Sequence, residues 1–213
     1  MGASRLERLA ARLGDERGRR VVFVSHCLLN QNVRYLGGAW CEGVVRDAIE
    51  PFVRDGIGIY QMPCPEQAAW GGVMKRLILP FYGARRVRAH ALLFAGLRAH
   101  TRRVYRRLAA RVAADIEDYV RSGVEVVGIV GVGDSPSCGV RRTLDMRRAL
   151  PVVTELDMDA IDARTFDEQV IRKCVVEGQG WFVEALRREL ARRKLDVPFL
   201  EHAPSLRFER PRA

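Results

Sequence analysis

Residues 124–133 read VEVVGIVGVG, an apolar run that is typical of a strand in a parallel sheet covered by helices on both faces. Three shorter runs of strand-forming residues stand at 21–27 (VVFVSHC), 57–64 (IGIYQMPC) and 197–202 (VPFLEH). Helical patterns separate these runs. The sequence therefore predicts an α/β fold, a single three-layer domain with a mainly parallel sheet and right-handed crossovers.

The helical segments lie between and around the predicted strands. The N-terminal segment places four apolar residues on one helical face, Leu6, Leu9, Ala10 and Leu13. Further helices are expected at 41–49, about 97–121, 167–178 and 179–194, and Pro51 is expected to break the first of these or to start a new one. We predict an N-terminal helical extension at 1–18, the α/β domain at 19–202 and a C-terminal tail at 203–213.

The composition is that of a globular chain of ordinary size. Hydrophobic residues make up 48% and charged residues 29% of the 213 residues. No apolar run reaches the ~20 residues that cross a bilayer, so we expect a cytoplasmic protein without a membrane partner. The net charge is +10, yet only three of the 36 basic residues are lysine. The arginines of 98–111 fit the solvated side of the long helix, although a nucleic-acid surface is an alternative interpretation.

Five cysteines are present, and their number and spacing exclude some kinds of site. An odd count without any CxxC pair disfavours a disulfide framework, a zinc ribbon and a thioredoxin-like redox site. Cys27 and Cys64 end two predicted strands, and Cys138 follows a third. Because the carboxyl ends of parallel strands open on one edge, these three thiols are expected to converge. Cys41 and Cys174 fall in predicted helices, where inert packing is expected.

Three converging thiolates suit several kinds of chemistry. They could be chemically idle, could hold zinc with a water, or could include a nucleophile, since Cys138 precedes an expected helix N-terminus and His26 stands beside Cys27. An iron–sulfur cluster with three cysteine ligands fits better. A cubane held by three ligands leaves one iron open, and an open iron is a Lewis acid suited to a soft sulfur atom.

Three motifs carry a resemblance to a known family. In chain order they are CLLNQNVRYLGG (27–38), PCPE (63–66) and SPSCG (135–139), and together with GQGWFVEALRREL (178–190) they resemble the 2-thiouracil desulfurase family over about residues 21–200. The resemblance implies a Rossmann-like fold and a 4Fe–4S cluster whose open iron takes the sulfur removed from the substrate. Its motif cysteines correspond to Cys27, Cys64 and Cys138.

The chain also departs from the family pattern. Asn30 replaces a usual glycine, Leu36 replaces the acid of the usual RYDG, and GVGD replaces a lysine-containing turn before SPSCG. These changes leave the cluster in place as an expectation but point to a diverged branch. Its substrate is then thiouracil-like or another small thio-compound, in which a thiocarbonyl sulfur is replaced by oxygen without net redox change.

The resemblance and the loop positions suggest roles for individual residues. Glu66 is the expected base, although it could instead serve a helix N-terminus. Ser135 and Ser137 would hydrogen-bond the substrate or a cluster sulfide, or cap the next helix, and Asp134 would replace the acid lost at Leu36. The expected substrate-binding residues are Arg34, Tyr35 and Asn30. The alternative functions are an iron–sulfur enzyme acting on thiolated tRNA and a non-catalytic iron–sulfur or zinc sensor.

Overall fold

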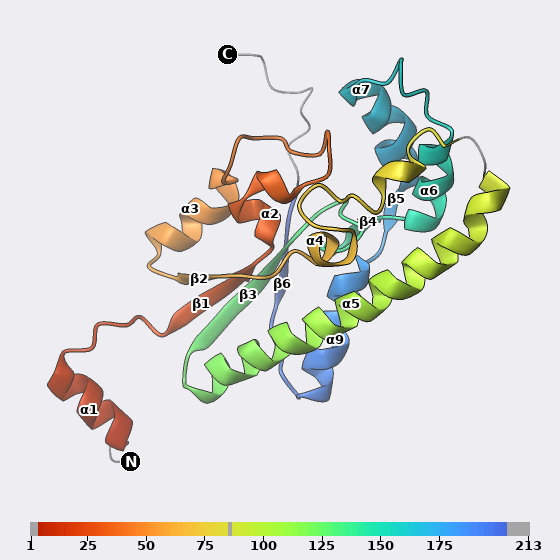
Figure 1. Ribbon diagram of the computed structural model, residues 1–213. Coiled ribbons are helices and arrows are strands. Elements are labelled where there is room, and N and C mark those ends of the chain that lie inside the picture. Colours follow the sequence, from red (N-terminus) through yellow and green to blue (C-terminus); the bar gives the residue numbers. More distant parts are fainter. Residues whose placement is uncertain (1–3, 85–86, 204–213) are drawn as a thin grey trace.

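The computed structural model describes residues 4–84 and 87–203. Its centre is a sheet of four strands, β1 (Arg20–Val24), β2 (Gly58–Gln61), β3 (Glu125–Val132) and β6 (Phe199–His202). The strands lie in the order β2-β1-β3-β6, and every neighbouring pair is parallel (Figure 1). The predicted α/β class and the parallel sheet are confirmed. The strands end sooner than predicted, so Cys27 and Cys64 lie three residues beyond β1 and β2.

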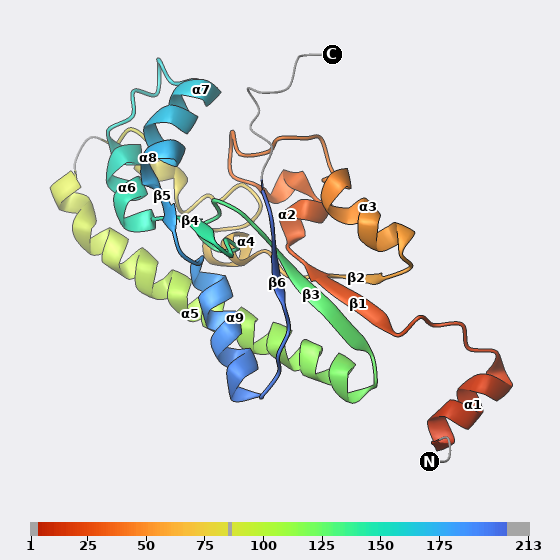
Figure 2. The ribbon, with the colours of Figure 1, turned by 180° about the vertical axis from the view of Figure 1, so that it is seen from behind.

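Helices cover both faces of the sheet, which makes the three predicted layers. Alternation within β1 shows how the layers form, because Val21 and Phe23 pack into one core cluster while Val22 and Val24 pack into another. The long helix α5 (Val87–Arg121) and helix α9 (Trp181–Arg192) cover the first face. The short helix α2 (His26–Leu29) and helix α3 (Arg46–Arg54) cover the second (Figure 2).

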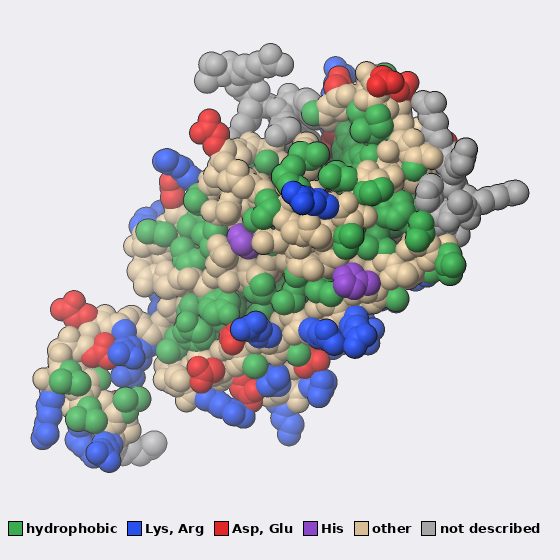
Figure 3. All heavy atoms as spheres, in the orientation of Figure 1, with side chains coloured by type: hydrophobic (Ala, Val, Ile, Leu, Met, Phe, Trp, Pro, Cys, Tyr) green, Lys and Arg blue, Asp and Glu red, His purple; other side chains and the backbone are tan. Residues whose placement is uncertain are grey.

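Helix α5 is the predicted basic helix, and it begins about ten residues earlier than expected. Val112 and Ile116 are fully buried, as the helical spacing requires. Five arginines lie exposed on its outer side, Arg102, Arg103, Arg106, Arg107 and Arg111. Figure 3 shows basic side chains gathered along the lower edge of the molecule, where α5 and α9 lie. This burial pattern is what a solvated helix face requires.

A second, smaller layer was not predicted. Strands β4 (Arg142–Leu144) and β5 (Val175–Glu177) form an antiparallel pair. Helices α6 (Met146–Thr154) and α7 (Ala163–Phe166), the π-helical turn η3 (Asp167–Ile171) and helix α8 (Arg172–Cys174) accompany the pair. The helix predicted over 167–178 is helical as far as Cys174, as η3 and α8, but its predicted end was wrong, because the β-branched Val175 and Val176 leave the helix for a strand. These elements together, which we call the α6–η3 layer, have their own small core, in which Cys174 is buried as expected.

Two details of the segment 41–54 also differ from the prediction. Pro51 neither breaks nor restarts the helix, since α3 runs through it. Proline removes one donor, which leaves the carbonyl of Asp47 without its helical partner, but both residues are exposed and water can replace the bond. Cys41 lies in a loop before α3, where its thiol lies 3.6 Å from the carbonyl oxygen of Val44.

The remaining elements are short, apart from helix α1 (Arg5–Leu13). Single turns form η1 (Gln31–Val33), α4 (Pro65–Ala69) and η2 (Leu79–Phe81). Helix α1 has a capping box between Ser4 and Glu7, and none of its residues is buried. The boundaries at residues 18 and 203 stay predictions, and residues 204–213 of the expected tail lie outside the described chain. No helix within the described ranges is long and apolar enough to cross a membrane.

Candidate active site

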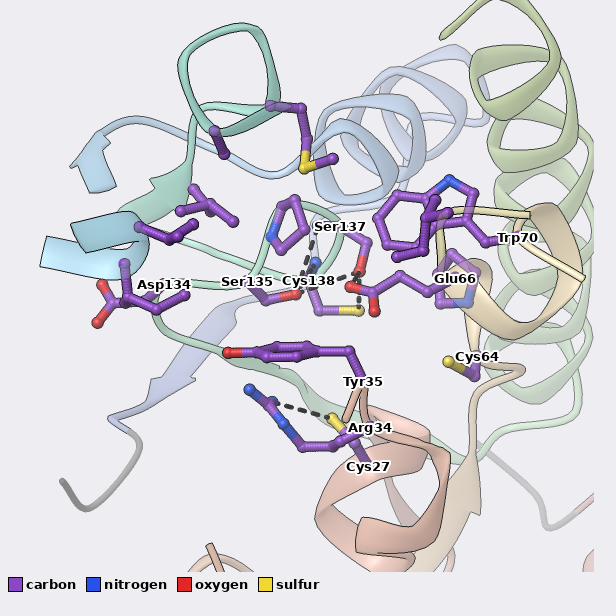
Figure 4. Close-up of a pocket in the computed structure, with 18 of the residues that line it drawn as sticks. Cys27, Arg34, Tyr35, Cys64, Glu66, Trp70, Asp134, Ser135, Ser137 and Cys138 are labelled. Carbon is purple, nitrogen blue, oxygen red and sulfur yellow. Dashed lines mark hydrogen bonds between the residues drawn. The ribbon is translucent and has the colours of Figure 1, made fainter. Parts of the chain in front are cut away.

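Three cysteines follow the carboxyl ends of three adjacent strands. Cys27 lies in α2 after β1, Cys64 precedes α4 after β2, and Cys138 lies in the loop after β3. All three line one cavity of about 910 Å³, a volume that includes the part open to solvent. Figure 4 shows the three sulfur atoms pointing toward the same space. The expected convergence at one sheet edge is therefore present in the structure.

The loop that carries Cys138 is held by hydrogen bonds that its own Ser135 accepts. Ser135 Oγ accepts from the amides of Ser137 at 3.3 Å and of Cys138 at 3.0 Å. Thr143 Oγ1 donates to the carbonyl of Ser135 at 3.0 Å, which ties the loop to β4. Ser135 therefore caps its own loop and does not cap a following helix. Asp134 enters the loop with a positive φ of 62°, a conformation that Asp tolerates better than most residues.

Helix α9 packs its first turn directly against this loop. The amide of Trp181 donates to the Pro136 carbonyl at 3.0 Å, and the amide of Phe182 donates to the Ser137 carbonyl at 3.2 Å. A side chain at Gly180 would place its Cβ 2.4 Å from the Ser137 carbonyl carbon, so only glycine allows this approach. The GQGW sequence thus serves to seat α9 on the loop and to fix the position of Cys138.

Each thiol has a polar neighbour, and two of these neighbours are cations. Arg34 Nη1 lies 4.0 Å from Cys27 Sγ, and Lys75 Nζ lies 3.9 Å from Cys64 Sγ. Ser137 Oγ lies 3.6 Å from Cys138 Sγ. A ligand that turns the thiols into thiolates would place negative charge beside the two cations.

Burial keeps the three thiols protonated while nothing binds them. It raises the pKa of Cys64 to about 11 and the pKa of Cys27 and Cys138 above the ordinary value of a thiol. The helix N-terminus that was expected to activate Cys138 as a nucleophile does not lower its pKa, because the first amides of α9 bond to carbonyls of the loop. His26 lines the cavity, and burial lowers its pKa, but within the described chain no hydrogen bond joins it to a thiol. A nucleophilic cysteine–histidine pair has no support here.

Glu66 is the acidic group at the centre of the site. Its side chain is buried at 8% exposure, it lines the cavity, and its Oε1 accepts a hydrogen bond of 2.9 Å from Ser137 Oγ. The bond joins α4, which follows β2, to the loop after β3. A carboxylate that faces a cavity and is held in one orientation is a good candidate for a proton acceptor.

Arg34 and Tyr35 also line the cavity, whereas Asn30 does not. The guanidinium of Arg34 lies 4.5 Å from the ring centre of Trp40 and 5.5 Å from that of Tyr35, so cation–π contacts hold it in place. The side-chain oxygen of Asn30 accepts from the amide of Asn32 at 3.1 Å and begins η1. The structure therefore does not bring Asn30 together with the other predicted substrate-binding residues.

Asp134 lies at the rim of the same cavity and pairs with Arg142 at 3.1 Å. Burial raises its pKa above the ordinary value, and the nearby Arg142 opposes that shift. Leu36, which replaces the acid of the RYDG pattern, is 57% exposed. Asp134 is thus the carboxylate available at the rim, although its pairing with Arg142 engages one oxygen.

Comparison with known proteins identifies the family. The family model described as 2-thiouracil desulfurase matches residues 22–195, which include every cysteine of the cavity. The chain belongs to the 2-thiouracil desulfurase family. The uncharacterized protein MJ0003 of Methanocaldococcus jannaschii is 40% identical over 50 residues, which are 24% of this chain and 32% of that protein. The chain thus matches about a third of this curated relative, and no solved structure matches significantly.

Two features of this desulfurase-family site were not predicted from the sequence. Lys75 is buried at 1% exposure, and its ammonium donates to the Val33 carbonyl at 2.6 Å beside Cys64. Lysine is rare in this arginine-rich chain, and that rarity is the one signal that could have singled it out. The second feature is an apolar wall from β4, α6 and η3, which no local pattern places near the cysteines.

The arrangement of the site also bears on which metal ion or cluster it could hold. Among the side chains that the structure describes, no three of His, Cys, Asp or Glu are already gathered as a site for one metal ion. A polynuclear cluster spans more space than a single ion, so its thiolate ligands stand farther apart. Three soft sulfur donors around a shared cavity, with cations beside two of them, fit such a cluster.

Proposed function

We propose that this chain is a desulfurase that replaces a thiocarbonyl sulfur by oxygen in a small thio-compound. Family membership supports the reaction class, and the cavity with three cysteines supports a 4Fe–4S cluster held by Cys27, Cys64 and Cys138. The hydrogen bond from Ser137 to Glu66 is the observation that carries the catalytic part of the proposal. It places an oriented carboxylate in the cavity that the three thiols share.

The cluster would supply one piece of chemistry that the side chains lack. With three thiolate ligands, a 4Fe–4S cluster has one iron without a protein ligand, which is a Lewis acid with affinity for sulfur. The chain contributes the charge balance, because Arg34 and Lys75 stand beside two of the sulfurs. Binding of the cluster must also release the protons of its thiol ligands. Without a cluster, the buried Cys64, with a pKa of about 11, would retain its proton.

The reaction itself is a hydrolysis without electron transfer. Water adds its oxygen to the thiocarbonyl carbon, the carbon–sulfur bond breaks, and the sulfur leaves as hydrogen sulfide while a carbonyl forms. Glu66 would accept a proton from the attacking water and return one to the departing sulfur. Ser137 would hold the Glu66 carboxylate in the orientation that this transfer needs.

The other predicted residues have supporting roles in this proposal. Arg34 and Tyr35 would orient a planar substrate by hydrogen bonding and stacking, since both face the cavity. Ser135 would act through the loop that it caps, and Asp134 would contribute an acid at the rim. The predicted binding role of Asn30 has no contact to support it, because its side chain serves η1.

The proposal is tested by removing the carboxylate without changing its shape. We expect Glu66→Gln, loaded with its cluster anaerobically, to lose at least a hundredfold in the rate of sulfide release from 2-thiouracil, the scale of a general base (about 10²–10⁴-fold). Its visible absorbance should match that of the wild type. Glu50→Gln, at an exposed position of α3, is the matched control and should keep the rate. Equal rates for Glu66→Gln and the wild type would remove Glu66 from the mechanism.

A further inference from the structure

The cavity has two chemically different halves. The segments that follow β1, β2 and β3 contribute the three thiols together with the imidazole, guanidinium and carboxyl groups of the lining, which belong to His26, Arg34, Glu66 and Asp134. The segment 142–171 contributes only apolar side chains to the lining, among them Leu144, Met146, Leu150, Val153, Val170 and Ile171. We call this second half the apolar chamber.

Part of the apolar chamber is backed by a packed cluster of buried side chains. Ala149, Val153 and Val170 are buried in the small core of the α6–η3 layer, and Leu144 packs against it. Aromatic rings join this wall to the loop of Cys27. The centroid of the Phe166 ring lies 6.0 Å from that of Tyr35 and 6.1 Å from that of Tyr82, with the latter pair stacked at 5°. A substrate that reaches the thiols therefore lies beside this wall.

The two halves constrain the shape of the ligand. A thiocarbonyl group directed at the sulfurs leaves the opposite part of the molecule against Leu150 and Val153. Ribose or phosphate placed there would lose hydrogen bonds to water without gaining partners from the wall. A hydrocarbon substituent would instead gain from leaving water, by about fourfold in affinity for each buried methylene (about 0.8 kcal/mol).

We infer that the preferred substrate is a thiocarbonyl heterocycle that carries an apolar substituent of several carbons, not a bare thiouracil or a thiolated nucleoside. This inference rests on the proposed function, and it adds a specificity that the family's name does not contain. Leu150 and Met146 of α6 are then specificity residues. They belong to the apolar chamber, which faces the substituent, and not to the half of the cavity with the thiols, which faces the thiocarbonyl group.

The activity test compares three thio-compounds on the cluster-loaded enzyme. We expect 6-propyl-2-thiouracil to be desulfurised with a kcat/KM at least tenfold above that of 2-thiouracil, and 2-thiouridine to fall below both. Leu150→Gln should make the kcat/KM for 6-propyl-2-thiouracil no more than about threefold above that for 2-thiouracil, since a buried amide opposes the propyl group. Leu92→Gln, at an exposed leucine of α5, should leave the ratio unchanged. Equal kcat/KM for propylated and bare thiouracil, or a preference for the nucleoside, would overturn the inference.

A binding measurement separates the chamber from the chemistry. Uracil and 6-propyluracil have no sulfur to lose, so their dissociation constants can be measured calorimetrically with or without a cluster. We expect 6-propyluracil to bind at least tenfold more tightly, and Leu150→Gln to abolish the difference. If that result holds while no thio-compound releases sulfide, the chamber stands and the proposed function fails. If both thiouracils react equally and both uracils bind equally, the proposed function stands and the chamber inference fails.

Discussion

Ser137 and Glu66 lie 71 residues apart in the chain and are joined by a hydrogen bond of 2.9 Å from Ser137 Oγ to Glu66 Oε1. The same hydroxyl lies 3.6 Å from Cys138 Sγ. One serine thus connects the carboxylate that we propose as the base with a thiol that we propose as a cluster ligand. The bond thereby fixes α4, which follows β2, relative to the loop that follows β3, across the intervening β1.

Replacing this serine should impair catalysis more than cluster binding. Ser137→Ala leaves the buried Glu66 carboxylate without its donor, and a hydrogen bond to a charged group contributes about 1.5–3 kcal/mol. We expect kcat/KM for sulfide release to fall by about 10- to 150-fold, the equivalent of that energy. Ser122→Ala, in the exposed turn after α5, is the control. A Ser137→Ala enzyme with wild-type kcat/KM would show that the bond does not orient the base.

The buried Lys75 should contribute to the stability of the site even without a cluster. Its ammonium donates to the Val33 carbonyl at 2.6 Å, so Lys75→Met leaves a buried carbonyl without a partner. We expect the free energy of unfolding in urea to fall by about 1–3 kcal/mol. Lys173→Met, at an exposed position, should change it by less than about 0.5 kcal/mol. If both variants unfold like the wild type, the Lys75 contact is not stabilising.

Two glycine-to-alanine substitutions should have opposite effects on stability. Gly180→Ala forces a methyl group to within 2.4 Å of Ser137 backbone atoms, so the free energy of unfolding should fall by about 1–3 kcal/mol or more. Gly96 lies within α5 with no atom in the way of a Cβ, so Gly96→Ala should raise it by about 1 kcal/mol. Denaturant titrations of both variants measure these changes. A neutral Gly180→Ala would mean that α9 can retreat from the Cys138 loop at little cost.

Glu201 of β6 should make stability depend on acid pH. Its Oε2 accepts from the amides of Val140 at 2.8 Å, Arg141 at 2.6 Å and Arg142 at 3.3 Å. Burial raises the pKa of the Glu201 carboxyl, but these backbone hydrogen bonds outweigh burial and leave the pKa below its ordinary value of 4.5. A lowered pKa means that the carboxylate stabilises the fold above pH 4.5 and that this stabilisation is lost as the pH falls through the folded-state pKa.

Glu201→Gln tests this pH dependence directly. The variant should be less stable than the wild type at pH 7, and the difference should shrink as the pH is lowered from about 5 toward 3, because only the wild type has a carboxylate at position 201 to protonate. Urea unfolding at a series of pH values measures it. A difference that stays constant across this range would assign the role of Glu201 to shape and not to charge.

Local sequence patterns were enough to predict the sheet and the thiol convergence. The apolar run of β3 indicates a buried parallel strand, and parallel strands place the residues after their carboxyl ends together. This reasoning predicted that Cys27, Cys64 and Cys138 converge at one edge of the sheet. In the structure they line one cavity together with Glu66, Ser135 and Ser137. Their chemical roles stay predictions.

Other features depend on contacts between distant segments, which periodicity does not contain. Strands β4 and β5 have three residues each, too few for an alternation pattern to be recognised. Lys75 reaches Val33 across 42 positions of the chain, and the apolar chamber forms only once α6 folds over the sheet edge. Pro51 is the opposite case, in which a local sequence rule predicted a helix break that does not occur. Water can replace the hydrogen bond that proline removes, because this helix position is exposed.

The central claim is that three strand-end thiols hold an iron–sulfur cluster, and counting metal and sulfide tests it most directly. After anaerobic purification and reconstitution, we expect about four iron atoms and about four acid-labile sulfides per chain, the content of a cubane cluster. Cys138→Ala should lose both, whereas Cys174→Ala, which removes a buried thiol of the α6–η3 core, should keep both. One zinc ion per chain without sulfide, or equal iron in the two variants, would contradict the account.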